Sequence, residues 1–160
     1  MTAPSLQDHD TARLLQDAAD RATRYLDSLG SRAVAPDASA VARLGELDEP
    51  MPTSGSAPAA VLARLDAMVA PATMAMAGPR FFGFVIGGTY PVALAADWLT
   101  SAWDQNAGLR EVTPAHSAAR EAVQGWFTDL LGLPQGTTMG TVTGGLMANF
   151  TGLAAARHAV

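Results

Sequence analysis

The chain has 160 residues, of which 49% are hydrophobic and 16% charged, a globular composition with enough length to bury a core. Its net charge of −5 argues against nucleic acid as a partner, and it has no apolar run long enough for a membrane span. The absence of cysteine excludes disulfides and thiolate metal sites, and together with the lack of a secretory signal it predicts a cytoplasmic protein.

The basic residues are of one kind. All ten are arginine, and the chain contains no lysine. Arginine stays protonated and is not a useful amine nucleophile, so the chain offers no side-chain amine for covalent catalysis. The three histidines, at positions 9, 116 and 158, are too scattered to suggest a metal site.

Apolar spacing predicts a helix over residues 11–29, ended by Gly30. Residues 31–58 form a linker-like stretch that includes Pro36, Pro50, Pro52, Gly55 and Pro58, with at most one short helical turn near residues 40–44. A second helix is expected over residues 59–69.

Residues 81–86 are aromatic and β-branched, which predicts a buried strand or extended segment. Thr89 and Pro91 fit the start of a helix in which Asp97 is expected to be a buried hydrogen-bond acceptor. Asp97 and Asp104 also suggest an acid–base pair, although a structural role is favoured for each. A further helix is predicted from Thr113 and Pro114 to residue 131.

Residues 139–143 are β-prone and lead into Gly144 and Gly145, after which a helix is expected to begin at Leu146. A strand, a glycine pair and a helix can hold a phosphate, because glycine lets backbone N–H groups approach an anion at the positive end of the helix dipole. A plain tight connection is the alternative. Residues 153–160 are helix-forming without a stop signal, so a continuation beyond them is expected.

Several short motifs stand in an order that resembles the group II pyridoxal-phosphate (PLP) decarboxylases, the family of the aromatic-amino-acid and glutamate decarboxylases. They are GPRFFGF at 78–84, YP at 90–91, ADWL at 96–99, TPA at 113–115, Trp126 with LLGLP at 130–134, and TGGLMAN at 143–149. The resemblance covers most of residues 79–160 and, more loosely, residues 25–69. It corresponds to the N-terminal third of such an enzyme.

The resemblance implies the start of a fold type I, aspartate aminotransferase-like α/β fold that is mostly helical in this portion. Residues 1–78 would form a helical arm and linker, and residues 79–160 the incomplete start of the PLP-binding large domain. The first helix would wrap a dimer partner, although an ordinary surface helix fits its apolar stripe equally well.

The resemblance also implies a site. Gly144, Gly145 and Leu146 would donate main-chain N–H groups to the PLP phosphate, and Phe84 and Val85 would pack against the substrate side chain. The family often has Ser or Thr where Leu146 stands, so one hydroxyl donor is missing. No catalytic residue is expected within this chain, because the family's cofactor-stacking His, its Asp and its Lys would all lie downstream of residue 160.

Two functions follow. The first is the N-terminal part of a PLP-dependent amino-acid decarboxylase that is inactive alone, since no lysine can anchor the cofactor. The second is a non-catalytic fragment that dimerises with a full-length paralogue or a separate C-terminal half. A different phosphate-binding domain ranks last, because the sequence has neither GxGxxG nor GxxxxGK[ST].

Overall fold

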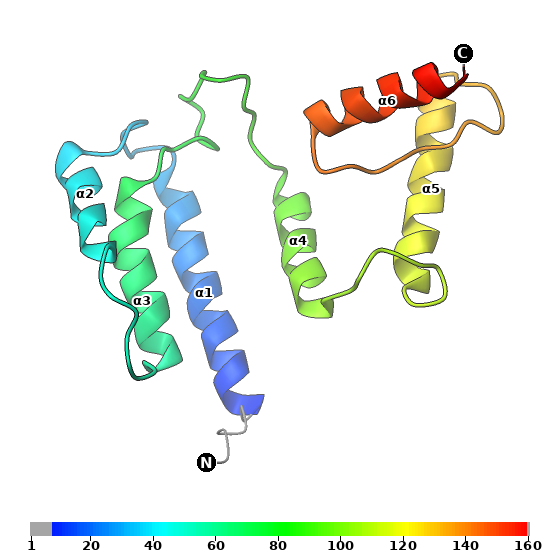
Figure 1. Ribbon diagram of the computed structural model, residues 1–160. Helices are drawn as coiled ribbons and strands as arrows, with labels where there is room; N and C mark the ends of the chain where they lie inside the picture. Colours follow the sequence, from blue (N-terminus) through cyan, green and yellow to red (C-terminus); the bar gives the residue numbers. More distant parts are fainter. Residues whose placement is uncertain (1–7, 160) are drawn as a thin grey trace. The chain divides into compact units, whose positions relative to one another are not determined.

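The computed structural model describes residues 8–159, and it is built from helices, turns and irregular chain. None of these described residues forms a β-strand (Figure 1). The chain divides between Leu94 and Ala95 into two compact units, which are described separately below. The predicted helical character of this portion is therefore confirmed, whereas neither residues 139–143 nor residues 81–86 form a strand.

The described residues of the first unit before α4 form the α-helices α1 (Asp8–Ser28), α2 (Ala38–Arg43) and α3 (Pro58–Val69), and the short 3₁₀ helices η1 (Leu44–Leu47) and η2 (Ala70–Ala72). The predicted helices at 11–29 and 59–69 are confirmed as α1 and α3. The linker holds more helix than expected, because Asp37 caps α2 by accepting a hydrogen bond of 2.7 Å from the Ser39 N–H.

Helix α1 packs beside α3, as the blue and green helices of Figure 1 show. Arg21 of α1 forms ion pairs with Asp17, at 3.0 Å, and with Asp66 of α3, at 2.8 Å. These hydrogen bonds, Asp17 first and Asp66 second, raise the pKa of the Arg21 guanidinium. The arginine thus links the two longest helices of the unit through a charge-assisted contact.

The chain after η2 is tied back onto α1 through Tyr25. The Tyr25 hydroxyl accepts a hydrogen bond from Thr73 at 2.9 Å and donates one to the Met74 carbonyl at 3.3 Å. Arg32 stacks on the Tyr25 ring, 4.6 Å from its centroid, and donates to the Ala70 carbonyl at 2.8 Å. Hydrogen bonds therefore connect residues 70, 73 and 74 to Tyr25 and Arg32.

The apolar core of the first unit is small. Its buried apolar side chains are Leu29, Met68 and Ala75. Gly78 lies against this core, and a Cβ at that position would stand 3.0 Å from the Ala75 carbonyl oxygen and 3.2 Å from that of Leu29. Glycine is needed here because the backbone approaches so closely.

Helix α4 (Pro91–Trp103) spans the boundary between the two units. The Tyr90 carbonyl accepts the first intrahelical hydrogen bonds, so Tyr90 occupies the cap position predicted for Thr89. Asp97 lies on the exposed surface of α4, so its predicted role as a buried acceptor is wrong. Its apolar neighbours in sequence did not imply a buried environment, because this helix buries none of its residues.

The second unit continues with α5 (Pro114–Leu130) and α6 (Gly145–Ala159). Thr113 is the N-cap residue of α5, as predicted, but its hydroxyl donates to the Leu109 carbonyl at 3.0 Å and caps no helical N–H. Gly132, at φ +60°, ends the helix in a Schellman motif with the Leu133 N–H bonded to the Thr128 carbonyl.

The described residues of the second unit bury no apolar core, although the length of the chain would allow one. Among its described residues, 95–159, no apolar side chain is buried, and the buried residues are the polar Thr113 and Ser117. Large apolar side chains are exposed instead, among them Trp98, Trp126 and Phe150. Helices need another helix or a sheet layer on which to bury an apolar face, and no strand is present in the described chain to supply one.

Candidate functional site

The predicted strand at residues 139–143 is an irregular segment that joins α5 to α6. A strand requires a neighbouring backbone to satisfy its N–H and C=O groups, and the described residues offer no second strand. High β-propensity at these positions was therefore insufficient, because propensity acts only within a sheet.

The Gln124 side chain supplies part of the hydrogen bonding that a neighbouring strand would give to this segment. The Gln124 amide of α5 donates to the Thr137 carbonyl at 3.2 Å, and its oxygen accepts from the Met139 N–H at 3.1 Å. One planar amide thus satisfies a main-chain acceptor and a main-chain donor on either side of Thr138, as a peptide group of an adjacent strand would.

The glycine pair begins α6. The helix starts at Gly145, one residue before the predicted start at Leu146, and the Gly144 carbonyl accepts the Ala148 N–H at 3.0 Å. Gly144 is therefore the N-cap, and the N–H groups of Gly145, Leu146 and Met147 belong to the first turn, which has no intrahelical acceptors for them.

The glycine pair is also open. A Cβ built at Gly144 or at Gly145 meets nothing within 4 Å, and Leu146 is 88% exposed. The site therefore has main-chain donors, the positive end of a helix dipole and free space for an anion. These properties fit a phosphate group, and a plain tight connection would have them as well.

Phe84 and Val85 form an exposed turn within the segment that was predicted to be a buried strand or an extended segment. Their φ angles are +56° and +55°, and the Ile86 N–H bonds to the Gly83 carbonyl at 3.2 Å. Phe84 is 79% exposed and Val85 107% exposed. A β-branched or bulky residue at positive φ is strained, and such strain often marks functional segments. This turn belongs to the first unit, and the glycine pair belongs to the second.

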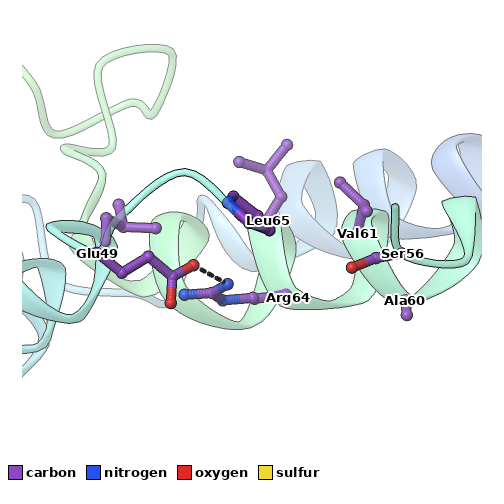
Figure 2. A pocket seen from close by; sticks show the side chains of 8 residues that line it. Glu49, Ser56, Ala60, Val61, Arg64 and Leu65 are labelled. Atoms are coloured by element: carbon purple, nitrogen blue, oxygen red, sulfur yellow. Dashed lines mark hydrogen bonds and ion pairs between the residues drawn. The ribbon is translucent and has the colours of Figure 1, made fainter. Parts of the chain in front are cut away.

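A groove of about 370 Å³ lies along α3 in the first unit, and Figure 2 shows the side chains that line it. Its lining is mostly apolar, with Val61 and Leu65 from α3, and it contains the ion pair between Arg64 and Glu49 at 2.5 Å. The hydrogen bond from Arg64, followed by its charge, lowers the pKa of the Glu49 carboxyl. None of the residues predicted for the site lines this groove.

Within residues 8–159, no group of three or more His, Cys, Asp or Glu side chains is placed to hold a metal ion. The helices of this described part are all too short or too polar to cross a bilayer.

The aromatic-L-amino-acid decarboxylase of Bacillus atrophaeus is 29% identical over 149 residues, covering 89% of this chain and 30% of that protein. No protein-family model matches the chain. The chain is therefore similar to part of an aromatic-L-amino-acid decarboxylase. It spans about 30% of the length of this curated relative.

Solved structures agree with this similarity. Oryza sativa TDC with PLP superposes with a TM-score of 0.74 at 25% identity, covering 89% of this chain and 30% of that one. The same protein with PLP and tryptamine gives 0.71 at 26% identity, over 83% and 27% of the two chains. Rhodiola rosea 4-hydroxyphenylacetaldehyde synthase, at 19% identity and a TM-score of 0.69, shares the fold over 81% and 28%.

Proposed function

We propose that this chain is the N-terminal part of a PLP-dependent amino-acid decarboxylase, a carboxy-lyase, in which the first turn of α6 binds the phosphate of the cofactor. The proposal is supported by similarity over 89% of the chain to a decarboxylase, and by an open glycine pair at a helix N-terminus. The relatives solved with PLP support the choice of cofactor.

The residues present fit the phosphate and do not fit covalent attachment. Gly145 and Leu146 would donate main-chain N–H groups, and the absence of a side chain at Gly144 and Gly145 would allow close approach. Leu146 contributes no hydroxyl, so the main chain carries the contact alone. Because the chain has no lysine, it has no side-chain amine to anchor PLP, and we expect it to be inactive by itself.

When bound, PLP supplies the electron sink for loss of the substrate α-carboxylate as CO₂. The part of this chain would be to hold the phosphate and to shape the substrate site. Phe84 and Val85 would contact the substrate side chain, since their turn is exposed and presents two apolar groups. In the complete enzyme we expect a homodimer that acts on an amino acid.

A second candidate function is favoured by one observation. The described part of the second unit exposes aromatic and aliphatic side chains on all three of its helices and buries no apolar one. Large exposed apolar patches often mark interaction sites, and we infer that another polypeptide would cover this surface. The chain would then be a non-catalytic fragment that pairs with a full-length paralogue or a separate C-terminal half.

The phosphate contact can be tested without a reactive aldehyde by titrating the ¹⁵N-labelled chain with pyridoxamine 5′-phosphate. We expect the amides of residues 144–147 to shift, and pyridoxamine without the phosphate to leave them unchanged. Gly145→Pro removes one donor at the first helical position, where proline is tolerated. Loss of one hydrogen bond to a charged group should weaken binding about tenfold or more.

Two control variants separate this effect from general damage to α6. Leu146→Ala removes a side chain but keeps its main-chain N–H, and Gly152→Ala changes a glycine in the helix interior that has open space around it. Both should bind as the unaltered chain does. Equal binding by Gly145→Pro, or shifts that appear outside residues 144–147, would contradict the proposed contact.

A further inference from the structure

We infer that Gln124 is the positioning residue of the glycine pair: its side-chain amide fixes the path of residues 137–139, from which the chain runs to Gly144 and Gly145. This inference rests on the proposed phosphate site. It assigns a function to a residue that the sequence pattern did not single out, on a helix that contributes no donor to that site.

The first support is the pairing itself. Gln124 donates to the Thr137 carbonyl at 3.2 Å and accepts from the Met139 N–H at 3.1 Å. Rotating the amide by 180° would set its NH₂ group against the Met139 N–H and its oxygen against the Thr137 carbonyl, so the two bonds define one orientation. A side chain with a donor and an acceptor in one plane is required.

The chain on either side of the Gln124 contacts is itself held by hydrogen bonds. Gln124 lies in the middle of α5, its carbonyl accepts the Thr128 hydroxyl at 2.9 Å, and its side chain is half-buried beside a hollow of about 190 Å³. The chain leaves α5 through the Gly132 motif and turns at Pro134, whose carbonyl accepts from the Thr137 hydroxyl at 2.7 Å.

The contacts of Gln124 also lie shortly before the glycine pair in the sequence. Met139 is the last residue before the glycine pair whose main chain is held by a side chain among the described residues. Residues 140–143 then run to the N-cap at Gly144. The Gln124 contacts therefore mark the point from which this short segment extends, and a fixed start reduces the ordering cost when an anion binds at its end.

The test compares Gln124→Met, which keeps length and removes both hydrogen bonds, with Gln124→Glu, which keeps only the acceptor. Gln135→Met, in the neighbouring turn and exposed, is the matched control. Hydrogen exchange of the Met139 amide reports the contact, and titration with pyridoxamine 5′-phosphate reports binding at residues 144–147. Circular dichroism of each variant verifies that helix content is unchanged.

We expect Gln124→Met to speed exchange of the Met139 amide about tenfold and to weaken pyridoxamine 5′-phosphate binding about three- to tenfold, on the scale of a lost hydrogen bond. Gln124→Glu should retain more of both properties, and Gln135→Met should match the unaltered chain. Faster exchange with unchanged binding would overturn the positioning role and leave the phosphate site standing. Failure of the unaltered chain to bind would overturn the proposed site and this inference together.

Discussion

Arg21 of α1 donates to the Asp66 carboxylate of α3 at 2.8 Å, across 45 positions of sequence. Both side chains are about one quarter to one third exposed, and Arg21 is shared with Asp17 of its own helix. Arg21 therefore pairs with one carboxylate of its own helix and with one carboxylate of a helix that is distant in sequence.

We expect Arg21→Met to lower the Tm of the chain more than Asp17→Asn, because Arg21 forms an ion pair with Asp66 of α3, whereas the partner of Asp17 is Arg21 in its own helix. A double-mutant cycle with Asp66→Leu should show coupling between Arg21 and Asp66. The readout is the Tm from circular dichroism at low and at high salt, since salt screens such a pair. Additive effects of the two single variants would show that the contact does not stabilise this packing.

The ion pair between Glu49 and Arg64 predicts a pH dependence. Because Arg64 lowers the pKa of Glu49 in the folded chain, the pair contributes stability above the ordinary carboxyl pKa and loses it as the pH falls through the lowered value. The Tm difference between the unaltered chain and Glu49→Gln should therefore be present at pH 7 and shrink as the pH falls below the ordinary carboxyl pKa. Asp48→Asn is the control, since Asp48 forms no ion pair with the described residues. A difference that persists in acid would contradict this sign.

Replacing Gly78 with a larger residue should destabilise the chain, because backbone atoms lie close to it. Alanine at this position would push a Cβ against two backbone carbonyl oxygens, and backbone cannot yield as a flexible side chain can. We expect Gly78→Ala to lower the free energy of unfolding by about 1–3 kcal/mol, the range typical of overpacking. Gly55→Ala, where the added Cβ meets nothing within 4 Å, should have little effect. Denaturant unfolding of both variants compares them directly.

Replacing Val85 with glycine should stabilise the chain, because Val85 has a positive φ. A β-branched residue in the left-handed region costs about 1–2 kcal/mol, which exceeds the 0.5–1 kcal/mol of extra unfolded-state freedom of glycine. Val85→Gly should therefore raise the free energy of unfolding by roughly 0.5–1 kcal/mol. Phe82→Gly, at an exposed position without a positive φ, should not raise it. If Val85→Gly destabilises the chain, the turn is not strained.

Helices were the predictable part of this fold. Apolar residues at helical spacing predicted α1 and α3, and Pro114 and Gly132 predicted the two ends of α5. These signals are local in the sequence, and the observed helices agree with them. Residues 81–86 and 139–143 failed as strands because a strand depends on a partner, which no local pattern reveals.

The candidate site divides in the same way. Gly144 and Gly145 could be predicted, since a glycine pair before a helix is visible in sequence. Gln124 could not, because its partners lie 13 and 15 positions away and nothing in the spacing of α5 distinguishes it from an ordinary surface glutamine.

The choice of a glutamine has a consequence for how the segment responds to acidity. A carboxylate could accept from the Met139 N–H, but it would repel the Thr137 carbonyl when ionised and change its bonding when protonated. An amide carries both functions without a titrating proton. The course of the chain toward Gly144 should therefore stay the same across the pH range in which carboxyl groups titrate.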